Sequence, residues 1–363
     1  MSERLPSLDV TRAVAMFGVV ALNYHGYLNS RQWSQPLDQS FWEALFNPLT
    51  GILTTRFAAT FVLVAGIGVS LFLASARNDP RALAARRLVL FRRGAFLFGL
   101  GLLLEWIWPG TIIFFYGAYF MLAAMIATWR TRSLVWSIIF ITAMSALLAG
   151  WRFDRGRLGE STSWLSPKID SPRNFLIRVL VDYTHPVFPW LAFLLAGMIL
   201  GRSIDRLVSL RGRLIALSVI TLAGAHVARH ALWPNLLIDR RDVVMRVLVS
   251  TDPYDRSVLY VISALATAVT AFLIISSFVD SRVNSSTVLF LGSVGRFSLT
   301  IYVLHVLFFN LVVDWFGIDR DGGLAVALGL AMIFYAFALI IAGWWSRLFG
   351  LGPFERLYRR FGG

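Results

Sequence analysis

Ten apolar runs, each close to the length that crosses a bilayer, constrain this chain more than any other feature. A hydrocarbon core of about 30 Å needs about 20 helical residues at a rise of about 1.5 Å each. The runs do not alternate apolar and polar residues, as the strands of a membrane β-barrel would. They lie at approximate positions 13–31, 51–75, 89–108, 111–129, 134–151, 186–201, 214–233, 257–279, 292–315 and 323–346. The sequence therefore predicts an all-α, polytopic transmembrane helix bundle of about ten helices.

The composition argues against a soluble protein. Apolar residues make up 57% of the 363 residues and charged residues only 15%, too few to cover the surface of a soluble domain of this length. The first run carries Asn23 and His25 and is followed by no small-residue cleavage site, so we do not expect a cleaved signal peptide. The absence of cysteine excludes disulfides and thiol nucleophiles. We expect one integral membrane domain over residues 1–363.

The arginines predict the orientation. When the N-terminus is placed in the cytoplasm and ten crossings are traced, the inner side holds 20 of the 34 basic residues but only 6 of the 20 acidic ones. This is the excess that the positive-inside rule describes, and it accounts for the whole net charge of +14. We therefore expect both termini in the cytoplasm, a multi-pass position in the plasma (inner) membrane with the lipid bilayer as partner, and no binding of nucleic acid.

Four polar residues lie near the outer ends of predicted helices. Asn23 and His25 fall toward the outer end of the first run, Arg56 lies a few residues inside the second, and Glu105 closes the third. A charged side chain costs about 2.5–3.5 kcal/mol at the bilayer centre, so such groups normally face protein or a water-filled cavity. We expect the four to line one cavity open to the outer face, where they could support acid–base chemistry with a cationic charge stabiliser. The structural alternative is an Arg56–Glu105 ion pair that only joins two helices.

Two more histidines lie near or inside predicted helices. His185 stands at the outer mouth of the sixth run. Ser298, Tyr302 and His305 are spaced four and three positions apart and therefore share one face of the ninth helix, with His305 near mid-membrane. The structural alternative for His305 is a core histidine bonded to a neighbouring carbonyl group.

Three further patterns have structural interpretations. His226 and His230 are one helical turn apart and resemble a metal pair, but no third ligand lies nearby, so we expect no metal site. The segment Gly66–Ser70 lies in an apolar run and indicates close helix packing rather than a phosphate-binding loop. Ser40 and Glu43 have the spacing of a capping box and predict a short interfacial helix.

Six short blocks, taken in order, resemble a known membrane family. Each alone is weak, but together they run from residue 8 to the C-terminal segment and cover essentially the whole chain. They are Leu8–Arg12 with Leu22–Tyr24, Arg56–Gly66, Phe115–Tyr119, Pro186–Gly197, Gly295–His305 and Gly352–Glu355. With these blocks the sequence resembles the YeiB-like membrane proteins, a family related to the heparan-α-glucosaminide N-acetyltransferases and to other membrane acyltransferases.

This resemblance implies acyl transfer across a membrane. In the characterised relatives, cytoplasmic acyl-CoA donates an acetyl group to a sugar amine on the far side, and an Asn at the end of the first helix and a His in the following loop are linked to catalysis. Asn23 matches the Asn, and His25 is the histidine nearest to the second position, because residues 26–50 contain none. We therefore expect a membrane acyltransferase that moves an acyl group, most simply acetyl, from cytoplasmic acyl-CoA to an envelope glycan or glycolipid acceptor at the outer face.

The expected roles follow from residue type. Either His25 or His305 removes the proton of the acceptor, and we prefer His25 as the base with His305 as a positioning group. A neutral imidazole titrates near pH ~6.5, whereas a buried arginine cannot accept a proton. Asn23 or Arg56 stabilises the oxyanion. The other candidates bind ligands: Glu105, Tyr116, His185, Trp190 and Tyr302 the acceptor, and Arg12, Arg92, Arg93 and Arg296 the CoA phosphates.

Two other classes of function use the same sequence features differently. Acyl-CoA is expected only as a donor substrate, with no permanently bound cofactor. The competing class is a transporter or flippase for a small lipid or glycan, in which the buried polar residues line a substrate path. A structural subunit of an envelope complex would not need those residues. The oligomeric state is open, with a homodimer and an envelope-complex subunit as candidates.

Overall fold

The computed structural model describes residues 5–29, 40–158, 171–232, 247–317 and 323–363, and every regular element among them is a helix. The fold class is therefore all-α, as predicted. The helices group into two compact units, and the chain passes from one to the other within α3 (Arg56–Ala74), α11 (Val258–Ser281) and α15 (Pro353–Gly362). Each unit is described in its own right below.

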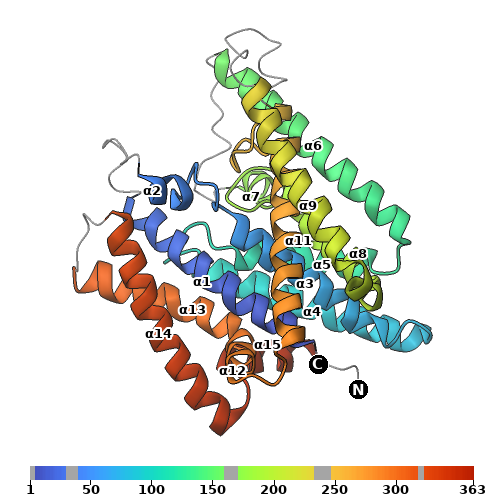
Figure 1. Ribbon diagram of the computed structural model, residues 1–363, viewed down its shortest axis with the longest axis vertical. Coiled ribbons are helices and arrows are strands. Elements are labelled where there is room, and N and C mark those ends of the chain that lie inside the picture. The colour runs from blue at the N-terminus through green and yellow to red at the C-terminus, as the bar shows by residue number, and fades with distance from the viewer. Residues whose placement is uncertain (1–4, 30–39, 159–170, 233–246, 318–322) are drawn as a thin grey trace. The chain divides into compact units, whose positions relative to one another are not determined.

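Unit 1 comprises residues 1–61 and 271–360, and α1 is its central element. The helices α12, α13 and α14 contact α1, and α14 also contacts α12 and α13 (Figure 1). A Cβ atom at Gly295 would lie 1.8 Å from the carbonyl oxygen of Asp9, so α12 meets the first turns of α1 at backbone contact. The helices are α1 (Pro6–Asn29), α2 (Phe41–Phe46), α12 (Ser286–Gly295), α13 (Ser298–Phe309), the π-helical η3 (Asn310–Trp315) and α14 (Leu324–Phe349).

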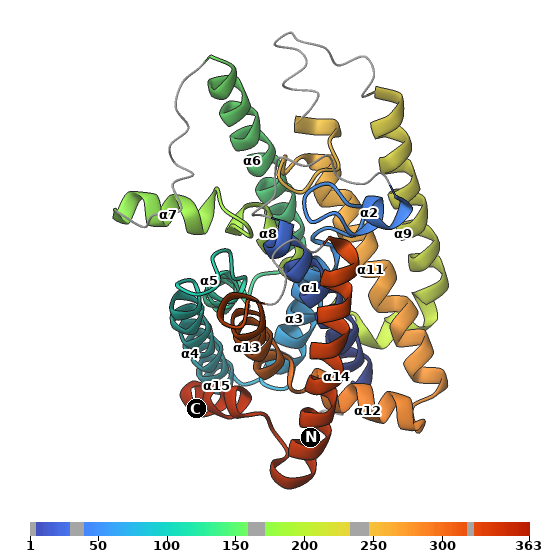
Figure 2. The same cartoon turned by 90° about the vertical axis from the view of Figure 1, so that its left-hand side faces the viewer.

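Unit 2 comprises residues 62–270 and 361–363. In it α4 packs along α5, and α8 contacts α5, α6, α7 and α9 (Figure 2). Close approach between α3 and α8 needs glycine, because a Cβ atom at Gly66 or Gly197 would lie 2.0 Å from a carbonyl oxygen of the other helix. The predicted close packing around Gly66 is thus confirmed. The complete helices are α4 (Pro80–Leu104), α5 (Ile113–Ile126), α6 (Thr131–Arg157), α7 (Pro172–Leu180), α8 (Val187–Arg202) and α9 (Ile204–Leu232).

Side-chain caps explain where several helices begin. The carboxylate of Asp79 accepts the backbone N–H groups of Arg81 and Ala82 at 2.9 and 3.2 Å, and Pro80 occupies the first helical position of α4. The hydroxyl of Ser40 accepts the backbone N–H of Glu43 at 3.2 Å. The predicted helix with its Ser40 cap is therefore confirmed over Phe41–Phe46, while the four positions before Ser40 lie outside the described residues.

Apolar side chains face outward along the longest helices. In α9, for example, Val208 and Ile220 are each 68% exposed, which is the pattern of a helix in contact with lipid rather than water. The helices long and apolar enough to cross a membrane are six among the described residues: α3, α6, α9, α11, α13 together with η3, and α14. The chain is therefore a membrane protein with several apolar helices.

Each predicted apolar run overlaps a helix of the structure. The run predicted at 292–315 is not one helix, because α12 ends at Gly295 and α13 begins at Ser298, with Arg296 and Phe297 between them. The apolar helices α5, α8 and α12 have only 10–17 residues each. The count of ten crossings and the cytoplasmic position of both termini remain predictions.

Candidate functional site

The central polar contact of unit 1 joins Asn23 on α1 to His305 on α13. The amide nitrogen of Asn23 lies 3.2 Å from Nε2 of His305, and Nδ1 of His305 faces the backbone carbonyl of Tyr302. Because a carbonyl oxygen only accepts hydrogen bonds, Nδ1 carries the proton, and Nε2 is left with a lone pair that accepts from the amide of Asn23. The imidazole is thereby held as one neutral tautomer with its basic nitrogen toward Asn23.

Aromatic side chains surround this pair. The His305 ring centre lies 4.6 Å from that of Tyr302 and 6.0 Å from that of Tyr24, whose hydroxyl donates to the His305 carbonyl at 3.0 Å. The two rings lie side by side, as the predicted shared helix face requires. His305 has no exposed surface and its Nδ1 faces the Tyr302 carbonyl, which is the geometry of the core-histidine alternative, and Tyr302 is also buried. A hydrogen bond in such apolar surroundings is electrostatically stronger than one in water.

His25 points to a different side of α1 from Asn23. Its Nδ1 lies 2.8 Å from the carbonyl oxygen of Phe46, and its Nε2 lies 3.2 Å from Oε1 of Glu43. Positions two apart on an α-helix are separated by about 200° around its axis, so the two side chains cannot reach one reacting centre together. Both ring nitrogens of His25 face oxygen atoms, so either the imidazole carries two protons or Glu43 holds one. The structure thus pairs Asn23 with His305 and separates them from His25, which pairs with Glu43.

Arg56 begins α3 and is buried, with 5% of its surface exposed. Its Nε lies 3.4 Å from the carbonyl oxygen of Ile52, and its own carbonyl accepts the hydroxyl of Thr60 at 2.8 Å. The residue before it, Thr55, has φ of +65°, a left-handed conformation that turns the chain into the helix. The predicted cavity of Asn23, His25, Arg56 and Glu105 remains a prediction, because Glu105 belongs to unit 2. Within unit 1, Asn23 and His25 lie on different sides of α1.

In unit 2, Glu105 is held by residues that follow it in sequence. Its Oε1 accepts from the guanidinium of Arg178, from the Tyr183 hydroxyl at 2.9 Å and from the Gly110 N–H at 3.0 Å. The Arg178 guanidinium also lies 3.6 Å from the centre of the Tyr183 ring, a cation–π contact. Glu105 thus has a cationic partner within its own unit, one that the sequence reasoning did not single out.

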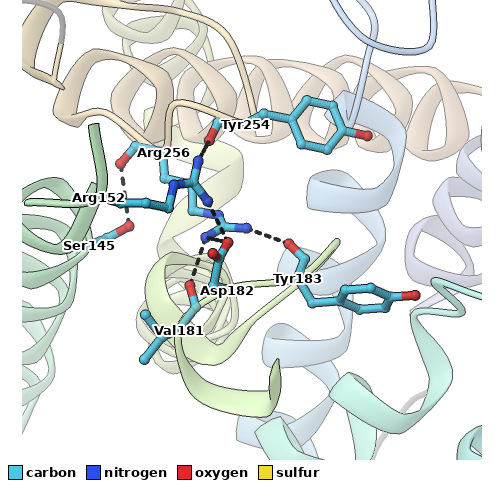
Figure 3. A network of polar contacts seen from close by, with 7 residues as sticks. All are labelled: Ser145, Arg152, Val181, Asp182, Tyr183, Tyr254 and Arg256. Atoms are coloured by element: carbon cyan, nitrogen blue, oxygen red, sulfur yellow. Dashed lines mark hydrogen bonds and ion pairs between the residues drawn. The ribbon is translucent and has the colours of Figure 1, made fainter. Parts of the chain in front are cut away.

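A second charged cluster, the Asp182 network of Arg152, Asp182 and Arg256, was not predicted from the sequence. Oδ1 of buried Asp182 lies 2.6 Å from the guanidinium groups of both Arg152 and Arg256. Arg256 also donates to the backbone carbonyls of Val181, at 2.7 Å, and Tyr183. Figure 3 shows the two arginines meeting at the one carboxylate from different segments of the chain. In the sequence these residues fall in or beside charge-rich connections between apolar runs, where charges usually meet water, so spacing alone gave no signal.

The other predicted acceptor-binding residues of unit 2 lie beside one another. The rings of His185 and Trp190 are 4.5 Å apart, and the hydroxyl of Tyr119 donates to the His185 carbonyl. Burial, reinforced by the charge of Arg256, lowers the pKa of His185 to about 3, so its imidazole is neutral at physiological pH. Tyr116 is buried against Tyr119, with ring centres 5.8 Å apart.

The four arginines predicted to bind the donor divide between the units. In unit 1, Arg12 pairs with Asp9 at 3.1 Å, and Arg296 directly follows Gly295, whose Cα hydrogen faces the Asp9 backbone. Arg12 and Arg296 therefore lie at the same end of α1. In unit 2, Arg92 is exposed, and the guanidinium of Arg93 lies 5.0 Å from the centre of the Phe72 ring.

Two family models match the chain. One, described as the catalytic region of heparan-alpha-glucosaminide N-acetyltransferase, covers residues 4–239. The chain belongs to this family. The other, described as a protein of unknown function (DUF418), covers residues 208–362, and together the two matches confirm the YeiB-like resemblance. No curated protein matches the chain.

Membership of the acetyltransferase family bears on the Asn23–His305 pair of unit 1. Asn23 lies in the acetyltransferase match and His305 in the second match, so the hydrogen bond between them joins the two matched regions of the chain. The described residues hold no cluster of three or more His, Asp or Glu side chains arranged to bind a metal. The best-organised proton-accepting group of unit 1 is thus the Nε2 atom of His305.

Proposed function

We propose that this protein is a membrane-embedded acyltransferase that moves an acyl group, most simply acetyl, from cytoplasmic acyl-CoA to an envelope glycan or glycolipid at the outer face. Family membership supports the reaction class. The observation that carries the proposal is the Asn23–His305 hydrogen bond of 3.2 Å, made inside an aromatic cage. A neutral imidazole with a fixed tautomer is suited to accept a proton, and an amide beside it is suited to donate to an oxyanion.

The reaction follows from these two groups. Nε2 of His305 takes the proton of an acceptor hydroxyl or amine, displacing the Asn23 amide, as the acceptor oxygen or nitrogen attacks the thioester carbonyl. The N–H groups of Asn23 then face the developing oxyanion. Collapse of the tetrahedral intermediate breaks the C–S bond, and the imidazolium returns its proton to the departing CoA thiolate. Removal of a positioned base costs about 10²–10⁴-fold in rate.

The preference for His305 differs from the sequence-based preference for His25. His25 has oxygen atoms at both ring nitrogens, so it has no lone pair to offer an acceptor unless Glu43 moves or is protonated. His305 has a neutral donor at Nε2, which an incoming hydroxyl can replace without leaving a charge unpaired. We therefore give the base role to His305 and a structural role to the His25–Glu43 pair.

The donor site is proposed from the positive charge of arginines, and the acceptor site from aromatic side chains with polar groups beside them. In unit 1, Arg12 and Arg296 at one end of α1 are the residues for the phosphates of CoA. Arg92 and Arg93 are the candidates for this role in unit 2. The acceptor contacts Tyr302 beside the proposed base. In unit 2 the candidates for contact with an acceptor sugar, through aromatic rings and polar groups, are Glu105, Tyr116, His185 and Trp190.

The test is acetyl transfer by the full chain in proteoliposomes. Radiolabelled acetyl-CoA is supplied on the side of the basic loops, an extract of envelope glycans and glycolipids is supplied on the other, and label in the extract is counted. We expect His305→Ala to abolish transfer and His25→Ala to lower it by less than ten-fold. His230→Ala is the matched control, because His230 is exposed at the end of α9.

Other outcomes have equally clear meanings. Loss of transfer in His25→Ala with normal transfer in His305→Ala returns the base role to His25. Normal transfer in both variants contradicts histidine catalysis. Movement of unmodified lipid or glycan across the vesicle membrane without any transfer of label would favour the transporter class.

A further inference from the structure

The C-terminal helix α15 has two distinct faces. Arg356, Arg359 and Arg360 are exposed on one side, and the apolar side chains Leu357 and Phe361, one turn apart, are 51% and 55% exposed on the other. A short helix with a basic face and an apolar face is typical of one that lies in the membrane interface, with its apolar side in the acyl region and its basic side among the headgroups.

The chain around α15 places it at such a boundary. The preceding helix α14 is long and apolar enough to span the membrane, and its last turns carry Trp344, Trp345 and Arg347, which favour the membrane–water interface. The chain then turns at Gly350, where φ is +76°, and α15 begins at Pro353, four residues after α14 ends. So short a connection keeps α15 next to the end of the span.

The one acidic residue of α15 faces the protein instead of the surface. The Glu355 carboxylate accepts the backbone N–H groups of Leu299 and Thr300 at 2.7 and 3.0 Å, and also the Thr300 hydroxyl. A Cβ atom at Gly352 would lie 2.1 Å from this carboxylate, so a larger residue there would displace the carboxylate. The exposed charges of α15 are consequently all cationic.

Glu355 also supplies a missing helix cap. The first N–H groups of a helix have no partner within the helix, and Phe297, at the N-cap position of α13, has no side chain that can accept them. The carboxylate of Glu355, on α15, accepts two of these N–H groups, those of Leu299 and Thr300. Since α13 carries His305 two turns further on, α15 is tied directly to the helix that holds the proposed base.

We propose that α15 binds anionic lipid headgroups through Arg356, Arg359 and Arg360, and that Glu355 transmits this attachment to the first turn of α13. The occupant is a lipid and not a free phosphate ligand, because the exposed Leu357 and Phe361 need an apolar phase beside the charges. The lipid site stands independently of the proposed function. Only the consequence for His305 rests on the acyltransferase assignment.

The lipid site is tested on the full chain in nanodiscs of phosphatidylcholine with phosphatidylglycerol as the minority lipid. Native mass spectrometry counts the phosphatidylglycerol molecules retained on release. A basic residue near an anionic surface contributes about five-fold in affinity, so we expect the triple variant Arg356→Gln, Arg359→Gln, Arg360→Gln to lose most retention. The control is the triple variant of Arg130, Arg132 and Arg206, which are exposed on other segments.

Equal retention in the α15 variant and the control overturns the lipid site. So does full displacement of the lipid by added CoA, which would assign the arginines to the donor phosphates.

The link through Glu355 has its own measurement, which uses no turnover. Hydrogen exchange of the Leu299 and Thr300 amides is expected to slow when phosphatidylglycerol is added to the nanodisc. In Glu355→Gln the lipid is still retained, but exchange at these amides is faster and no longer depends on the lipid. Thr300→Val removes the hydroxyl that contacts Glu355 and accepts the Phe354 N–H, but leaves both backbone bonds to Glu355, and is expected to keep the lipid dependence. Unchanged exchange in Glu355→Gln overturns the link and leaves the acyltransferase assignment unaffected.

Discussion

The two compact units bury polar groups in different ways. In unit 1 the pair Asn23–His305 is uncharged and held by one side-chain hydrogen bond of 3.2 Å. In unit 2 one carboxylate, Asp182, is shared by the guanidinium groups of Arg152 and Arg256 at 2.6 Å each. Breaking the first contact exposes no net charge, whereas breaking the second leaves a charge unpaired in a buried place.

The difference separates a contact that can exchange partners from one that cannot. A buried ion whose partner is lost costs several kcal/mol, so the Asp182 network is expected to stay closed in every working state of the protein. A neutral hydrogen bond is worth about 1 kcal/mol net, so an acceptor hydroxyl can replace Asn23 at His305. Unit 1 therefore offers the place for proton transfer, and unit 2 offers a rigid anchor.

The largest effect is expected on removal of the shared carboxylate. Asp182→Ala leaves Arg152 and Arg256 facing each other without a counter-charge, and the loss of one partner from a buried pair costs about 3–5 kcal/mol. We expect a marked fall in the melting temperature in detergent, measured by static light scattering or tryptophan fluorescence. Asp205→Asn, at an exposed position in the first turn of α9, is the control. An unchanged melting temperature for Asp182→Ala would contradict the anchoring role.

The next-largest effect is expected on the rate of acetyl transfer, with the melting temperature unchanged. Asn23→Ala removes the proposed oxyanion donor, and the loss of one such donor lowers kcat by about 10²–10³-fold. The measurement is single-turnover acetyl transfer, with the melting temperature recorded alongside. Asn310→Ala is the matched control, because the Asn310 amide, at the start of η3, donates only locally, to the Val306 carbonyl of α13 at 2.8 Å. An equal loss in both variants would place Asn23 among the structural residues.

A smaller effect is expected in the pH dependence of stability. The folded protein lowers the pKa of His185 from 6.5 to about 3, so on acidification the unfolded chain takes up a proton that the folded chain refuses. The contribution of neutral His185 to the free energy of unfolding is full above pH ~6.5. It is lost progressively as the pH falls toward the pKa of His185 in the folded protein. We expect His185→Gln to flatten the decline of the melting temperature between pH 7 and 5. The same slope in both proteins would contradict burial of a neutral His185.

The smallest effect is expected at the second histidine of α1. Glu43→Gln keeps the shape of the side chain and removes its charge, so the contact to His25 at 3.2 Å becomes a neutral hydrogen bond. If this pair only holds α2 against α1, the variant should lose about 1 kcal/mol of stability and its transfer rate should change by less than about three-fold. A loss of 100-fold or more in the same transfer assay would make His25 and Glu43 the catalytic pair.

Local patterns in the sequence predicted the helices well, because the length and polarity of a run are properties of neighbouring residues. The polar contacts depend on residues far apart: Asn23 and His305 are 282 positions apart, and Arg256 and Asp182 are 74. No spacing rule connects such positions in a single sequence. Helix geometry did, however, contain one signal that the prediction overlooked. Residues two apart on a helix diverge, which alone separates Asn23 from His25.

The cap of α13 has a consequence for the order in which the protein is made. Synthesis proceeds from the N-terminus, and Glu355 is made 55 residues after Thr300, the residue whose N–H it accepts. While the ribosome is still translating α14, α13 begins with open N–H groups and its end is free to fray. The first turn of α13, two turns before His305, is therefore capped only once α15 has emerged and docked. A chain that stops before residue 355 should therefore lack the cap on α13, the helix that carries the proposed base.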